Sequence, residues 1–182
     1  MKSTLNYMKK LDNRHVVLGV AFDWGRRKGL DVFIELSHRL PNESYRIVLV
    51  GTDDHIDAQL PKDIISIHKT QNQRQLAELY AMASVFVIPT REENFPTVNL
   101  EALACGTPIV SFRTGGSPEM LDDKTGIVVE VNDIEATEEA IKDICEKKKC
   151  SDKDYIVAYS KKFDMRDKYM EYIELYSAVL EE

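Results

Sequence analysis

Short apolar runs recur along this sequence, and a segment with helical periodicity separates each run from the next. The runs span residues 15–21, 45–50, 64–67, 85–88, 108–112 and 127–129. Strands that are apolar at consecutive positions are typical of parallel sheets covered on both faces. Their alternation with helices predicts an α/β fold with a doubly wound, Rossmann-like parallel sheet.

The composition favours one globular domain and excludes several classes of protein. The chain has 182 residues, of which 43% are hydrophobic and 30% charged, enough for a sizeable core. A net charge of −7 without a basic stripe argues against a nucleic-acid partner. No apolar run reaches the length of a membrane span, and residues 1–14 form a polar lead-in without a signal-peptide core.

The three cysteines, Cys105, Cys145 and Cys150, are odd in number and have no histidines clustered around them. We expect reduced thiols in a cytoplasmic protein, and no metal site at these positions.

The segment 90–106 is predicted to run from strand through loop to helix, with Pro96 at the first helical position. Glu101 is unusual in this helix because its neighbours three and four residues away are all small or apolar. These neighbours are Thr97, Val98, Ala104 and Cys105. We therefore expect the carboxylate to point into an apolar surface, where it needs a hydrogen-bonding partner. Two partners stay open: the hydroxyls of a ligand such as a ribose, or backbone amides of a neighbouring loop.

Three loops are expected at the carboxyl ends of strands, where doubly wound sheets bind ligands: residues 25–29, 92–96 and 114–117. Each leads into a helix, and a helix N-terminus attracts phosphate. The basic run Arg26, Arg27 and Lys28 fits either a diphosphate or a solvated turn. Gly115 and Gly116 mark either a tight turn or a place where a ligand approaches the backbone. Neither a G-x-G-x-x-G fingerprint nor a Walker A lysine motif is present.

The run ENFPTVNLEALACGTPIVSFRTGG contains Glu93 and Glu101, and Glu119 and the segment 125–129, TGIVV, follow it. This combination resembles the signature of family 4 glycosyltransferases, which are retaining, nucleotide-sugar-dependent enzymes of the GT-B fold. The resemblance is to the carboxyl-terminal half only. It implies that residues 15–182 form a donor-binding domain, one half of a GT-B fold. The last helix, about 164–180, would cross back toward an amino-terminal acceptor domain of the same full-length chain.

Residue by residue, the resemblance makes Glu93 the catalytic position, in contact with hydroxyls of the donor sugar. Glu101 would hold the ribose, and Lys28 would add positive charge at the diphosphate. The implied substrate-binding residues are Glu101, Lys28, Arg27, Asn94, Phe95, Thr97, Val98 and Lys69. Amides around Phe95, Thr97 and Val98 would hold the diphosphate, and Lys69, beside His68, would lie near the base.

Two positions depart from the family pattern. Asn94 stands where the family usually has glycine. Asp23 stands five residues before Lys28, where the family has arginine, so Arg26 or Arg27 would have to substitute.

The resemblance implies a nucleotide-sugar donor as substrate, no cofactor and no metal. Membrane contact, as a peripheral protein at the inner face, would come only through the absent half. Two other hypotheses remain open, a non-catalytic nucleotide-sugar binding module and a nucleotide-sugar epimerase. The aromatic stripe of the last helix also predicts self-association of this chain.

Overall fold

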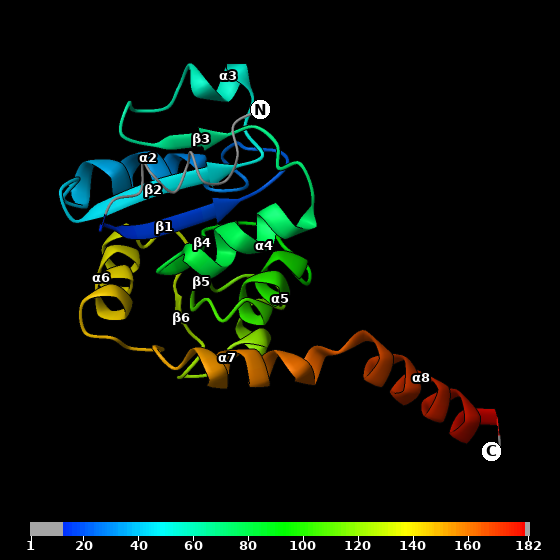
Figure 1. The fold of residues 1–182 in the computed structure, drawn as a ribbon. Helices are drawn as coiled ribbons and strands as arrows, with labels where there is room; N and C mark the ends of the chain where they lie inside the picture. The colour runs from blue at the N-terminus through cyan, green and yellow to red at the C-terminus, as the bar shows by residue number, and fades with distance from the viewer. Residues whose placement is uncertain (1–12, 181–182) are drawn as a thin grey trace.

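The computed structural model describes residues 13–180, so most of the polar lead-in 1–14 lies outside the described residues. All strand pairs in this part are parallel, and the sheet has six strands in the order β3-β2-β1-β4-β5-β6 (Figure 1). The strands are β1 His15–Val20, β2 Tyr45–Val50, β3 Ile65–Ile67, β4 Val85–Ile88, β5 Ile109–Phe112 and β6 Gly126–Val129. The predicted doubly wound, Rossmann-like sheet is confirmed.

Helices connect the strands and cover both faces of the sheet (Figure 1). They are α2 Leu30–Arg39, α3 Asp54–Asp57, α4 Gln73–Met82, α5 Thr97–Ala104, α6 Ile134–Cys145, α7 Lys153–Ser160 and α8 Met165–Leu180, with 3-10 turns η1 Pro118–Met120 and η2 Lys161–Phe163. Helices α2 and α6 bury Phe33 and Ile141 in one core. Helices α4, α5 and α7 form the second core, which contains Leu103 and Ile156.

The strand order reverses between β1 and β4. Helix α2, which follows β1, packs on one face of the sheet, and α5, which follows β4, packs on the other. The loops that leave these adjacent strands therefore diverge and open a crevice at the carboxyl edge of the sheet, as in other doubly wound folds.

Two of the predicted helices differ in detail from the structure. Pro96 is the N-cap of α5 and not its first helical residue, so the helix begins at Thr97. After the loop 114–117, Ser117 is the N-cap and Pro118 the first residue of a helical segment, but this segment is only the short 3-10 turn η1. In the polar stretch 52–63, the Asp53 side chain accepts a hydrogen bond from the Ile56 amide and starts α3.

Helix α8 leaves the body of the domain and projects away from it (Figure 1). None of its residues is buried, and Tyr169, Tyr172 and Tyr176 are 61%, 59% and 66% exposed. These tyrosines recur at helical spacing, so α8 offers an uncovered aromatic stripe, as the sequence predicted. Within residues 13–180, no helix combines the length and apolarity that crossing a membrane requires.

We expect the chain to self-associate through α8, because burying this stripe removes apolar surface from water. Sedimentation or light scattering should show oligomers whose fraction rises with protein concentration. A variant that ends at Asp164 should stay monomeric and keep its melting temperature, since α8 buries nothing in the domain. A strictly monomeric full chain at high concentration would contradict this expectation.

Candidate functional site

A cavity of about 300 Å³ lies at the crevice between β1 and β4. The loop after β1 lines one side, and the end of β4 with the start of α5 lines the other. The lining residues are Val20, Ala21, Phe22, Asp23, Trp24, Arg27, Lys28, Val87, Ile88, Pro89, Thr90, Glu93, Phe95, Pro96, Thr97 and Val98. The strand-order reversal thus brings together two segments that are about 65 residues apart in sequence.

Helix α5 begins at this cavity. Its N-cap, Pro96, has no side-chain capping bond, and Pro96, Thr97 and Val98 all line the cavity. The first N–H groups of an α-helix have no partner within the helix, so those of Thr97 and Val98 are available to an anion. The start of α5 therefore supplies donors and partial positive charge without any cationic side chain.

Lys28 and Glu93 form an ion pair inside the cavity, with 2.7 Å between Nζ and Oε2. Their side chains are 22% and 19% exposed, so the pair is largely shielded from water. The other carboxylate oxygen of Glu93, Oε1, accepts a hydrogen bond from the Asn94 amide at 3.3 Å. Both oxygens of Glu93 are therefore held, and its orientation in the cavity is fixed.

Arg91 ties the basic loop to the loop after β4. Its amide donates to the Arg27 carbonyl at 2.9 Å, and its guanidinium donates to the Arg26 carbonyl. The same guanidinium donates a hydrogen bond to each carboxylate oxygen of Asp31, both at 2.8 Å. Burial raises the pKa of Asp31, but the hydrogen bond and charge of Arg91 outweigh it and leave that pKa below its ordinary value. Arg91 thereby holds Lys28 opposite Glu93.

The loop after β1 is anchored by Trp24, which is the single tryptophan of the chain. Its indole N–H donates to the Val50 carbonyl at 3.0 Å, and its ring meets Phe33 edge-on with centroids 5.5 Å apart. Asp23, at the position of the family arginine, lines the cavity, and so does Arg27, whereas Arg26 does not. Of the two expected substitutes for that arginine, Arg27 is the one at the site.

The glycine pair after β5 supports the Glu93 loop. A Cβ added at Gly115, where φ is +49°, would lie 1.9 Å from the Glu93 carbonyl oxygen. The Gly116 amide donates to the Asn94 carbonyl at 2.5 Å. The chain's own loop occupies the space that a side chain at either glycine would need, which accounts for glycine at both positions.

Glu101 lies one turn into α5 and differs from its expected environment. It is exposed, not directed into an apolar surface, and the Tyr80 hydroxyl of α4 donates to its Oε2 at 3.0 Å. Of its neighbours on the helix, Thr97 and Ala104 are exposed as well, while Val98 and Cys105 are half-buried. The buried polar side chain of α5 is Asn99, whose Oδ1 has no hydrogen-bond partner among the described residues.

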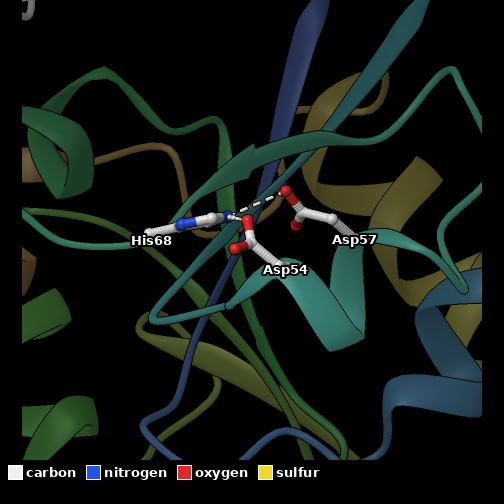
Figure 2. Close-up of side chains that lie close together, drawn as sticks. All are labelled: Asp54, Asp57 and His68. Atoms are coloured by element: carbon white, nitrogen blue, oxygen red, sulfur yellow. Dashed lines mark hydrogen bonds and ion pairs between the residues drawn. The ribbon is translucent and has the colours of Figure 1, made fainter.

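His68 and Lys69 follow β3, are exposed, and do not line the cavity. The Nε2 atom of His68 lies 2.8 Å from Oδ2 of Asp57 and 3.9 Å from Oδ1 of Asp54 (Figure 2). The hydrogen bond with Asp57 raises the pKa of His68 above its ordinary value. The ligand atoms of these three residues lie within 4.8 Å of one another, which would suit a metal ion, but the ion pair already accounts for their proximity.

The three cysteines are free thiols in the structure. Burial raises the pKa of Cys145 to about 12 and that of Cys150 to about 11, and it also raises the pKa of Cys105. None of these thiols has the lowered pKa that a nucleophilic cysteine needs.

Fold and cavity together define a doubly wound α/β domain with a ligand crevice at its switch point. The sequence matches the family "Glycosyl transferases group 1" over residues 10–163. The chain belongs to this family.

Curated relatives carry glycosyltransferase names. The GDP-mannose-dependent alpha-(1-6)-phosphatidylinositol monomannoside mannosyltransferase of Mycolicibacterium smegmatis is 36% identical over 135 residues, which is 65% of this chain and 35% of that protein. The D-inositol 3-phosphate glycosyltransferase of Xylanimonas cellulosilytica is 33% identical over 117 residues, which is 58% of this chain and 28% of that protein. The aligned segments therefore cover about a third of these relatives.

Solved GT-B structures share the fold. The structure of Anabaena HepE in complex with UDP aligns with 96% of this chain and 51% of its own, with a TM-score of 0.80 and 19% identity. Sucrose-phosphate synthase from Thermosynechococcus elongatus aligns with 96% of this chain and 48% of its own, with a TM-score of 0.70 and 22% identity. At these identities the likeness establishes the fold, and the chain spans about half the length of each structure.

The structure brings most of the predicted residues to one cavity. Those that line it are Lys28, Arg27, Glu93, Phe95, Thr97 and Val98. Asn94 follows Glu93 in the same loop, Glu101 lies one turn further along α5, and Lys69 lies apart at the end of β3. The sequence missed Tyr80, because its place in the apolar stripe of α4 indicated only a core residue.

We expect Gly115→Ala to destabilise the protein, because the new Cβ would meet the Glu93 carbonyl and because a positive φ is strained for alanine. Denaturant unfolding should show a free energy of unfolding that is about 1–3 kcal/mol lower than that of the unaltered protein. Gly25→Ala is the matched control, since its Cβ would meet nothing within 4 Å and its φ is not positive. Equal stability of the two variants would show that the Gly115 loop does not pack as described.

We expect Asp57→Asn to lower the pKa of His68 toward its ordinary value of about 6.5. The folded pKa is raised, so this pair contributes stability below about pH 6.5 and loses it as pH rises through the raised value. NMR titration of the His68 ring measures the shift. Asp54→Asn is the control and should lower the pKa of His68 by less, because the Asp54 carboxylate lies further from Nε2 than that of Asp57. Equal shifts in both variants would contradict the Asp57 hydrogen bond.

Proposed function

We propose that this chain is the donor-binding half of a retaining glycosyltransferase that uses a nucleoside diphosphate sugar. The observation that carries the proposal is the shared cavity, in which the Lys28–Glu93 ion pair faces the uncapped start of α5. A diphosphate needs cations and amide donors. A sugar needs a carboxylate that accepts hydrogen bonds from its hydroxyls. The cavity offers both within one crevice.

In this proposal the diphosphate lies at the start of α5, against the amides of Phe95, Thr97 and Val98. Lys28 and Arg27 add positive charge from the opposite loop. The same groups would stabilise the charge that develops on the leaving diphosphate, which is where preorganised donors accelerate transfer most. Glu93, held by Lys28 and the Asn94 amide, would accept hydrogen bonds from the sugar and stabilise positive charge developing on it.

The ribose would lie at Glu101 and the base near Lys69. Glu101 and Thr97 are both exposed and are one helical turn apart on the same face of α5. Four residues of helix correspond to about 6 Å, so a nucleotide with its diphosphate at Thr97 has its ribose beside Glu101. No metal is needed for this arrangement, because helix amides and side-chain cations provide the positive charge.

The proposal assigns acceptor binding to an amino-terminal domain of a longer chain. Residues 15–182 would be the donor domain, and α8 would cross toward its partner domain and cover the exposed tyrosines there. Support comes from the solved structures, since this chain aligns with about half of HepE, whose structure holds UDP. Any contact with the inner face of a membrane would belong to that other domain, and we propose a cytoplasmic location.

We expect the chain alone to bind a nucleoside diphosphate sugar but to transfer nothing. Binding needs one side of the cleft, whereas transfer also needs an acceptor held against the sugar. Such positioning supplies roughly 7–11 kcal/mol of a two-substrate barrier at best. Calorimetry with UDP, GDP and their sugars should give a dissociation constant of tens of micromolar or weaker, on the order of −6 kcal/mol. Product analysis with sugar and lipid acceptors should find only slow donor hydrolysis.

A matched pair of variants tests the place of the diphosphate. Lys28→Gln should weaken binding of the diphosphate roughly ten- to hundredfold, because a charge-assisted contact is worth roughly 1.5–3 kcal/mol. Lys62→Gln removes the same charge from an exposed residue that precedes β3, outside the cavity, and should change little. If the unaltered chain binds none of the nucleotides tested, the assignment of the donor site is overturned. Efficient transfer by this chain alone would overturn the half-enzyme assignment.

A further inference from the structure

Tyr80 is a buried tyrosine on α4 whose hydroxyl reaches an exposed carboxylate on the neighbouring helix. The residue is 1% exposed, yet its hydroxyl donates to Oε2 of Glu101 at 3.0 Å. We propose that Tyr80 is a positioning residue, which holds the Glu101 carboxylate in the orientation that receives the ribose hydroxyls of the nucleotide. The inference rests on the proposed function and deepens it.

The tyrosine ring is a rigid support. It meets Phe86 of β4 edge-on, with centroids 5.4 Å apart and an angle of 75° between the rings. The Tyr80 carbonyl accepts a hydrogen bond from the Thr107 hydroxyl at 2.7 Å, which fixes the end of α4 to the loop after α5. Because ring and backbone are both held, the direction in which the hydroxyl points is fixed by the fold.

Glu101, in contrast, has a long side chain and an exposed position on α5. A side chain of this kind samples several rotamers in water, and ordering it when a ligand binds opposes binding. The hydrogen bond from Tyr80 selects one orientation before the ligand arrives. A carboxylate has two oxygens and about four lone-pair sites, and within residues 13–180 its hydrogen bond is the one from Tyr80 to Oε2. Oε1 and the rest of Oε2 can therefore accept two ribose hydroxyls.

The surroundings leave room for a ligand at this point. A hollow of about 240 Å³ lies beside Glu101 and Tyr80, between α4 and α5. Gln73, Leu76 and Ala77 of α4 line it, together with the end of α5. Val98, one turn before Glu101, lines the main cavity, so α5 contributes residues to both hollows. In the proposal, a nucleotide with its diphosphate at the start of α5 places its ribose at the Glu101 end of this helix.

The test is Tyr80→Phe, which deletes only the hydroxyl. Glu101 is exposed, so water can replace the lost donor, and the melting temperature of the variant should stay close to that of the unaltered protein. Calorimetry with UDP and GDP should show affinity about three- to tenfold weaker for the nucleotide that the unaltered chain binds. The 2′,3′-dideoxy form of the same nucleotide lacks the two hydroxyls, and its affinity should change less than about twofold.

Tyr45→Phe is the matched control. Tyr45 is also buried, and its hydroxyl also donates to a carboxylate, that of Glu146, but it begins β2, at the opposite end of the strands from the cavity. This variant should leave both affinities unchanged. In a Glu101→Gln background, adding Tyr80→Phe should cost clearly less than it costs alone, because both changes act on one contact.

Three results would overturn the inference. Equal losses for the ribose and dideoxy nucleotides would show that Tyr80 acts only through the fold. A full additional loss in the Glu101→Gln background would show that the two residues act independently. Failure of the unaltered chain to bind either nucleotide would overturn the proposed function and this inference together, whereas the first two results leave the proposed function standing.

Discussion

The reversal of strand order between β1 and β4 is the constraint on which the rest of the site depends. Because α2 and α5 pack on opposite faces of the sheet, the loops after these two strands separate and leave a crevice between them. Lys28 comes from one loop and Glu93 from the other, and they meet across it. The order of the buried parallel strands thus determines where the crevice lies, and the polar residues of the loops determine only what it can bind.

Side chains around the crevice then hold its two loops in a fixed position relative to each other. Arg91 joins the basic loop to the segment after β4, and Trp24 fastens the loop after β1 to β2. Gly115 lets a third loop pack directly beneath the backbone of Glu93. Arg91 is half-buried and Trp24 buried, whereas Asp31 and Gly115 are exposed, and of these four residues only Trp24 lines the cavity. This arrangement is one in which binding groups are oriented before a ligand arrives.

The sequence predicted the strands well and the contacts poorly. Residues such as Val85 and Phe86 are apolar on both faces of a buried strand, so their pattern alone locates β4. The contact between Tyr80 and Glu101 joins residues 21 positions apart on different helices, and no spacing rule within one helix can find it. Small and apolar neighbours suggested a buried Glu101, but Thr97 and Ala104 are exposed with it, and only Val98 and Cys105 pack partly against the core.

The family resemblance added what spacing could not. It named Lys28 and Glu93 as parts of one site, and the structure brings them within 2.7 Å across 65 residues of chain. It also placed Lys69 beside the base, a role that the cavity lining does not test. The sequence pattern indicates only a core position for Tyr80, because its hydroxyl gains a partner only when α4 packs against α5.

The central claim is that a nucleotide lies along α5 with its diphosphate at the helix start, and amide NMR tests it most directly. Spectra recorded as UDP or GDP is added should show the largest shifts at the amides of Phe95, Thr97 and Val98 and at the Trp24 indole. The corresponding nucleoside, which has no phosphates, should leave these signals nearly unchanged. Shifts confined to other parts of the domain, or identical shifts with nucleoside and nucleotide, would contradict the account.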